Sequence, residues 1–130
     1  MITEDFCSFE VAKLLKEKGF DELCIFKYNS EGVRMKAGVA IDEWQNSELD
    51  DDECSCVSHQ MAMKWLREVH KLAFIISPQW AEGDMRNPCR WYWEIRGLED
   101  IDLDVYSNPL CNTYEEAVEA ACIYSLKNLI

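Results

Sequence analysis

Two cysteines and a histidine within six residues form the pattern in this chain that is most typical of a metal site. They are Cys54, Cys56 and His59, in the order Cys-x-Cys-x-x-His. Thiolates and imidazole nitrogens bind structural zinc, which takes four ligands, usually in two spaced pairs. This motif supplies three, and a fourth would have to come from a remote residue such as Cys111. We therefore predict no metal and no cofactor, with these three residues as the candidate ligands.

A pair of carboxylates is the second pattern that could do chemistry. Asp102 and Asp104 lie in a run that alternates between apolar and polar side chains, so both project from one face of a predicted strand. Such a pair can hold Mg²⁺, but two acids are also typical of a strand face exposed to water. The chain contains no G-x-S-x-G nucleophile motif and no glycine-rich phosphate loop. The sequence thus predicts no catalytic residues and a protein that is not an enzyme.

The densest charge in the chain is negative and local. Five acids fall within six positions: Glu48, Asp50, Asp51, Asp52 and Glu53. Like charges at this density repel one another and disfavour regular secondary structure, so we predict an exposed acidic loop at about 42–57. Trp44 and Trp80 also lie in predicted loops, and an exposed tryptophan can dominate the binding energy of an interface. These seven residues form the predicted interaction surface.

Composition limits the class of protein and of partner. The 130 residues fit a single domain, 1–130, and the net charge is −12. A surface of this sign repels nucleic acid and anionic membranes, but it suits a basic protein partner. The seven cysteines, an odd number, together with the absence of a signal sequence, favour free thiols in the cytoplasm. No uncharged apolar stretch is long enough to span a membrane.

Hydrophobic periodicity gives the elements that must position these residues. Amphipathic helices are predicted at 8–18, 58–70 and 113–129, and strands at 23–28, 33–41, 72–77, 90–96 and 101–106. Ser8, Ser58 and Thr113 are the expected N-caps, and Glu116 completes a capping box. Breaks are expected at 79–88 and at Asn108-Pro109. The order α-β-β-α-β-β-β-α predicts an α+β fold with a mostly antiparallel sheet and helices on one face.

Three segments of the chain resemble a group of known proteins: SFEVAKLLKEKGF, MAMKWLREVH and TYEEAVEAACIYSLKNLI. Together they are similar to small uncharacterised proteins of Bacteroides and related gut bacteria, and of their phages and prophages. The resemblance covers the helices, about a third of the chain. It implies a cytoplasmic protein encoded by a mobile element, and it carries no catalytic residue, cofactor or activity over to this chain.

Together these patterns favour a phage-type or mobile-element protein that works as a non-enzymatic interaction module. It would bind a protein partner or associate with itself, without direct contact to nucleic acid or membrane. Two alternatives stay open. One is an acidic mimic of nucleic acid that inhibits a host DNA-binding protein. The other is a small metal-dependent enzyme that uses the Cys54, Cys56 and His59 motif or the Asp102 and Asp104 pair.

Overall fold

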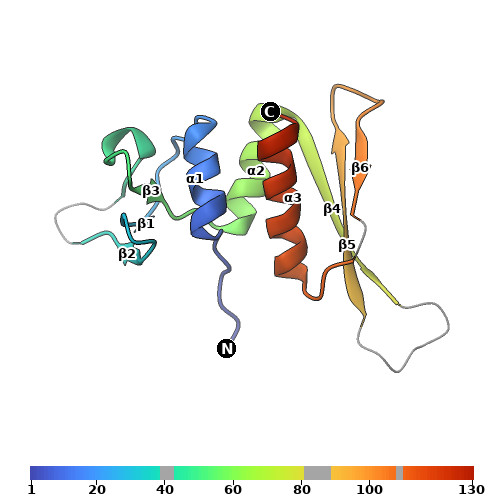
Figure 1. Ribbon diagram of the computed structural model, residues 1–130, viewed down its shortest axis with the longest axis horizontal. Helices are drawn as coiled ribbons and strands as arrows, with labels where there is room; N and C mark the ends of the chain where they lie inside the picture. Colours follow the sequence, from blue (N-terminus) through green and yellow to red (C-terminus); the bar gives the residue numbers. More distant parts are fainter. Residues whose placement is uncertain (39–42, 81–88, 108–109) are drawn as a thin grey trace. The chain divides into compact units, whose positions relative to one another are not determined.

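The computed structural model describes residues 1–38, 43–80, 89–107 and 110–130. It contains three α-helices and two antiparallel three-stranded sheets, which confirms the predicted α+β fold and its order of elements (Figure 1). The elements are α1 (Phe9–Glu17), β1 (Phe26–Tyr28), β2 (Arg34–Lys36), the 3₁₀ turn η1 (Asn46–Glu48), β3 (Cys54–Ser55), α2 (His59–His70), β4 (Leu72–Gln79), β5 (Arg90–Gly97), β6 (Asp104–Tyr106) and α3 (Tyr114–Asn128).

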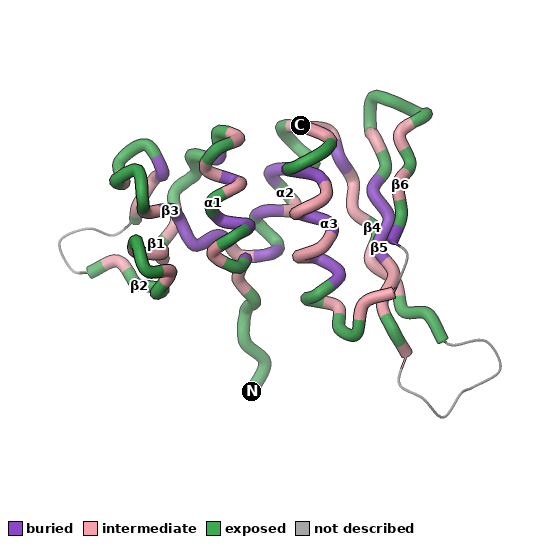
Figure 2. The backbone as a smooth tube through the Cα atoms, in the orientation of Figure 1, coloured by how far each residue is buried: buried purple, intermediate pink, exposed green. Residues whose placement is uncertain are grey.

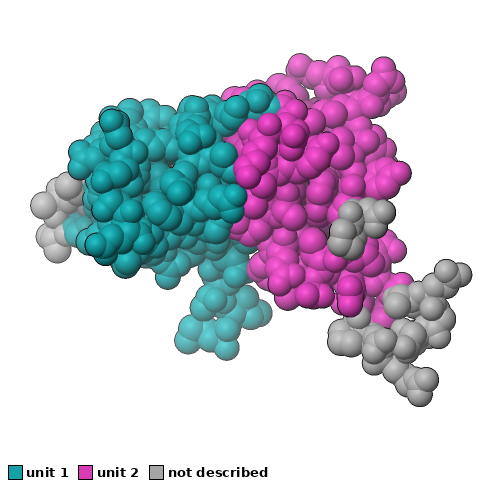
Figure 3. Space-filling model, viewed as in Figure 1, with its two compact units in different colours: residues 1–62, 130 teal, residues 63–129 magenta. Residues whose placement is uncertain are grey.

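The chain divides into two compact units, coloured separately in Figure 3. Unit 1 comprises Met1–Ala62 with Ile130, and unit 2 comprises Met63–Leu129, so the boundary falls inside α2. Each unit has its own sheet, β2-β1-β3 in the first and β4-β5-β6 in the second. That residues 1–130 form a single domain stays a prediction.

The first helix of unit 1 begins and ends where its sequence indicates. The Ser8 hydroxyl accepts from the Val11 N–H at 3.2 Å, which satisfies one of the unpaired donors of the first turn. At the other end Gly19 has a φ of 95°, a left-handed conformation that glycine adopts without strain. The Phe20 N–H then donates to the Leu15 carbonyl at 2.9 Å, and the Phe20 side chain is fully buried. This Schellman ending turns the chain back onto the apolar face of α1.

The sheet of unit 1 contains a strand in the segment that sequence assigns to a loop. Lys27 and Tyr28 of β1 pair with Ser55 and Cys54 of β3, whose two residues are fully buried. A further bridge joins Cys24 to Trp44 through backbone bonds of 2.8 and 2.7 Å. The segment after Asp42 is therefore tied at two places, to β1 and to Cys24 just before it. Strand β2 is observed at Arg34–Lys36, and its predicted end at 39–41 lies outside the described residues.

The sheet of unit 2 packs its apolar face on α3. Trp91 contacts Tyr114 and Trp93 contacts Tyr124, with ring centroids 5.4 and 5.6 Å apart. Ile95 is fully buried on the same face. Within unit 2, Figure 2 shows buried residues along α3 and the central strand β5. The alternation predicted for residues 90–96 is thus confirmed, with the opposite face of the strand left polar.

Two strand boundaries of unit 2 differ from the prediction. Strand β4 continues through Pro78 to Gln79, because the proline nitrogen lies on the side of the strand that faces away from β5, where no ladder bond is lost. Strand β6 begins only at Asp104, because the Asp100 carboxylate accepts from the Asp102 N–H at 3.1 Å and holds a turn there. Most of the predicted loop at 79–88 and the predicted break at Asn108-Pro109 lie outside the described residues.

Side chains also cap the remaining helices. Ser58 Oγ accepts from the Met61 N–H at 3.2 Å, and Thr113 Oγ1 accepts from the Glu116 N–H at 3.1 Å. The Glu116 carboxylate accepts from the N–H of Asn112 at 3.0 Å, one residue before the cap, so the box closes one position earlier than in the usual motif. The three predicted N-caps are therefore all observed.

Candidate functional site

The acidic loop, defined here as residues 43–53, is built around one buried polar side chain. Asn46 is 5% exposed and lies in η1. Its Nδ2 donates to the Phe20 carbonyl at 2.6 Å, and its Oδ1 accepts from the Ser55 N–H at 2.8 Å. The amide thus links the loop to the end of α1 and to β3. The sequence does not single out this residue, because an isolated asparagine next to an acidic run carries no periodicity.

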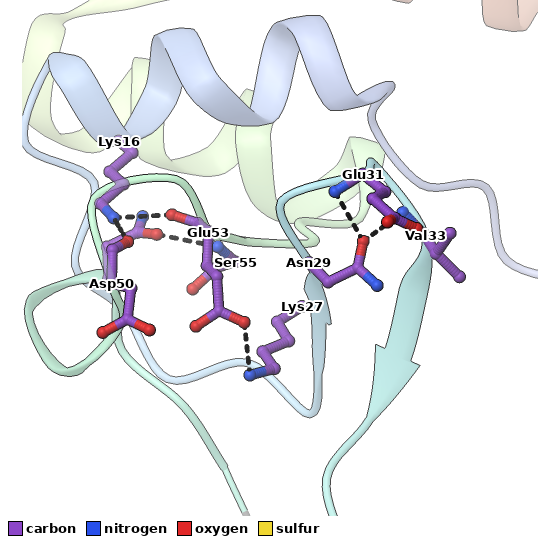
Figure 4. A network of polar contacts seen from close by, with 9 residues as sticks. Lys16, Lys27, Asn29, Glu31, Val33, Asp50, Glu53 and Ser55 are labelled. Carbon is purple, nitrogen blue, oxygen red and sulfur yellow. Dashed lines mark hydrogen bonds and ion pairs between the residues drawn. The ribbon is translucent and has the colours of Figure 1, made fainter.

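A lysine from α1 closes the loop from the other side. Figure 4 shows the Lys16 ammonium directed at the turn between Asp50 and Glu53. It donates to the backbone carbonyls of both residues at 2.6 Å, while the Glu53 N–H donates to the Asp50 carbonyl at 3.0 Å. Hydrogen bonds from a charged donor are stronger than those between neutral groups. The ammonium therefore stabilises the turn through its backbone and forms no ion pair with Asp50.

A second lysine, from β1, joins the tryptophan and one acid of the loop. Lys27 Nζ lies 2.8 Å from Glu53 Oε2 and 4.9 Å from the centroid of the Trp44 ring (Figure 4 shows the ion pair). The hydrogen bond from Lys27 lowers the pKa of the Glu53 carboxyl, with its charge and the nearby Lys16 acting in the same direction. Trp44 is half-buried and Glu53 is paired, so both belong to the framework of the loop more than to its outer surface.

The outer surface of the loop carries the other four acids of the predicted cluster. The side chains of Glu48, Asp50, Asp51 and Asp52 are exposed. Among the described residues no ion pair involves any of these four carboxylates. One more hydrogen bond holds the loop that bears these acids: the Ser47 N–H donates to the Asp21 carboxylate at 2.7 Å. The arrangement presents closely spaced negative charges on a framework fixed by Asn46 and two lysines.

The other predicted interaction residue belongs to unit 2. Trp80 directly follows β4 and is 56% exposed, so its prediction as an exposed loop tryptophan agrees with its environment. It is not part of the acidic loop, whereas Trp44 is a residue of that loop. The seven residues predicted as one interaction surface therefore divide between the two units.

The candidate metal ligands lie in the interior. Cys54, Cys56 and His59 are at most 4% exposed. Burial raises the pKa of the Cys54 thiol to about 11 and also raises that of Cys56, which disfavours the thiolate that a metal requires. Over the described ranges, the ligand atoms of these three residues are not gathered within 4.8 Å of one another. The motif therefore does not form a three-ligand site in this structure. The alternative of a metal-dependent enzyme stays a prediction, and these three residues provide no site for it.

A charged cluster occupies the open face of the second sheet. The Arg96 guanidinium lies 2.6 Å from Glu94 and 4.0 Å from Asp104. Tyr92 and Tyr106 stack beside it with centroids 6.1 Å apart. Hydrogen bonds lower the pKa of Glu94, mainly the one from Arg96, whereas the adjacent Glu94 raises the pKa of Asp104. The partners of Asp104 are thus Arg96 and Glu94, rather than Asp102 as the spacing suggested.

Unit 1 also contains an apolar groove of about 200 Å³. Its lining includes three apolar residues with exposed side chains: Leu23 (54% exposed), Ile25 (47%) and Met61 (39%). Glu4 is the one charged residue that lines it.

Over the described residues, none of the helices has the length and the apolar character needed to cross a bilayer. Comparison with known proteins adds no relative: no protein-family model, curated protein or solved structure matches this chain.

Proposed function

We propose that this chain is a non-catalytic interaction module that binds a basic protein surface through the acidic loop. The observation that supports the proposal most strongly is that exposed carboxylates lie on a loop whose backbone is held by hydrogen bonds. Glu48, Asp50, Asp51 and Asp52 are exposed, while Asn46 and the lysines hold the segment that bears them. A surface that is ordered before binding loses less conformational entropy when a partner docks.

The negative charge of this chain favours a partner with a positively charged surface. The chain carries −12, and among the described residues no ion pair involves the exposed acids Glu48, Asp50, Asp51 and Asp52. Opposite charge on a partner would increase the rate of association and would make the affinity depend on salt. A phage or mobile-element origin, as the helix segments suggest, stays a prediction, and the genes adjacent to this one would test it.

A matched set of three proteins tests the surface. In the first variant the exposed loop acids are neutralised: Glu48→Gln, Asp50→Asn, Asp51→Asn and Asp52→Asn. In the control, four exposed acids elsewhere are neutralised: Glu17→Gln, Glu68→Gln, Glu99→Gln and Asp102→Asn. Both variants have the same net charge, so a difference between them reports the position of the acids and not their number.

Affinity capture from a bacterial lysate, followed by titration of each captured protein at low and high salt, gives the readout. We expect a basic protein that binds the wild type and the control, loses affinity for the loop variant, and dissociates as salt rises. Equal binding to all three proteins, or no captured protein at either salt concentration, contradicts the proposal. If duplex DNA displaces the captured partner, the result favours the alternative of a nucleic-acid mimic.

A further inference from the structure

The second sheet has an edge whose hydrogen-bonding groups point outward. In an antiparallel sheet the N–H and C=O of one residue face the same neighbouring strand, and successive residues alternate. The Ser107 N–H donates to the Trp93 carbonyl at 2.8 Å, so odd-numbered residues of β5 face β6. Even-numbered residues of β5 therefore face β4, where Glu94 is paired with Ile75. It follows that the odd-numbered residues of β4 bond to β5.

The even-numbered residues of β4 direct their backbone groups away from the sheet. These are Leu72, Phe74, Ile76 and Pro78, of which the proline has only a carbonyl. Within the described part of the chain, none of these outward groups has a hydrogen-bond partner. Unpaired groups along a strand form a template to which another strand can bond.

The remaining sheet edges are protected in the ways usual for folded proteins. Strand β6 has three residues and includes Asp104, and β3 has two residues. Strand β2 has three residues, of which Arg34 and Lys36 are cationic. Short length and charge both discourage the addition of a further strand. Strand β4 has eight residues, Leu72–Gln79, and no charged side chain.

Two of its side chains are only partly covered on the helix side. Phe74 and Ile76 pair with Ile95 and Trp93 of β5, so they lie on the face that packs on α3. Ile95 and Trp93 are buried, whereas Phe74 and Ile76 are only half-buried. A fourth strand beside β4 would cover these two side chains, and the most suitable strand would place apolar residues on that face.

We propose that two copies of this chain associate through β4, whose antiparallel pairing joins their three-stranded sheets into one. Outward-facing residues must pair with outward-facing residues, so even positions lie opposite even positions in any such register. Phe74 and Ile76 of both copies then share the helix-side face and cover each other. The edge is therefore complementary to itself.

Charge also selects a second copy as the occupant. The chain carries −12, and most of its surface would repel another copy. The β4 edge bears no charge, so self-pairing there brings no carboxylate beside a carboxylate. A basic partner would find no acid along this strand to favour it. The association goes beyond the binding of a partner by the acidic loop, because it uses a different unit and different groups.

Sedimentation velocity over a range of concentrations tests the association with a matched pair of variants. Ile75→Lys places a cation in the middle of the edge strand, at a side chain that is 38% exposed, and charge there discourages the addition of another strand. Ile101→Lys makes the same change at a residue that is 95% exposed and lies in the turn before β6. We expect the wild type and Ile101→Lys to dimerise, and the Kd of Ile75→Lys to be at least about tenfold higher.

Amide hydrogen exchange locates the interface without relying on a variant. We expect the Phe74 and Ile76 amides of the wild type to gain protection as the protein concentration rises. The Ile75 amide, which bonds to β5, should be protected at every concentration. A monomer at all concentrations overturns the proposal. So does a dimer that Ile75→Lys leaves intact, or one in which the Phe74 and Ile76 amides exchange as fast as in the monomer.

Discussion

Replacement of Asn46 by alanine should destabilise unit 1 far more than a change at an exposed loop residue would. The substitution removes the acceptor of the buried Ser55 N–H and takes one donor from the Phe20 carbonyl. A buried donor left unsatisfied costs about 1–3 kcal/mol, and the second lost bond adds about 1 kcal/mol. We therefore expect the free energy of unfolding to fall by about 2–4 kcal/mol.

Gln45→Ala is the matched control. It removes the same kind of group one residue earlier, where the Gln45 amide donates to the Asp21 carbonyl at 3.1 Å in an exposed position. Exposed substitutions of this kind usually change stability by no more than about 0.5 kcal/mol. Urea denaturation followed by circular dichroism measures both variants, and hydrogen exchange at the Ser55 amide reports the local effect. Equal unfolding midpoints for the two variants would refute the role assigned to Asn46.

The remaining predictions concern an ion pair, a helix cap and the thiols. Glu53→Gln should lower the urea midpoint at pH 7, because it removes the ion pair with Lys27. The pKa of Glu53 in the folded state is below its ordinary value of 4.5, so the stabilisation is present above pH 4.5 and is lost as the pH falls through the lowered pKa. The difference between the variant and the wild type should therefore vanish in strong acid. Thr113→Ala should cost about 1 kcal/mol in a denaturant titration and Thr113→Ser much less, because only the hydroxyl caps α3. In the native protein, an alkylating reagent should modify half-buried Cys111 well before Cys122, whose thiol is fully buried and has a raised pKa. Mass spectrometry measures both rates, and equal rates of alkylation would contradict the burial of Cys122.

The sequence predicted those features that depend on neighbouring residues. Ser8 and Gly19 mark the ends of α1 because a cap and a left-handed residue act within one turn. The alternation of Trp93 and Glu94 gave the two faces of β5, since strand periodicity is a local property. The fold class followed from these local patterns.

The features that the sequence did not predict depend on contacts between distant segments. Strand β3 exists because Asn46 and β1 bond to it, and nothing within its two residues signals a strand. Lys16 closes the acidic loop from 34 residues away in the sequence. Pro78 reads as a strand end in the sequence, because a proline is tolerated only where β4 forms the edge of a sheet, and the order of the strands shows that edge.

The claim that the acidic loop is a fixed surface is tested most directly by ¹⁵N relaxation of its backbone amides. We expect order parameters near 0.85 for residues 46–53, about equal to those of α1, because Asn46 and Lys16 hold the segment. Values below about 0.6 over that segment would show a mobile chain of acids and would contradict a surface that is ordered before its partner binds.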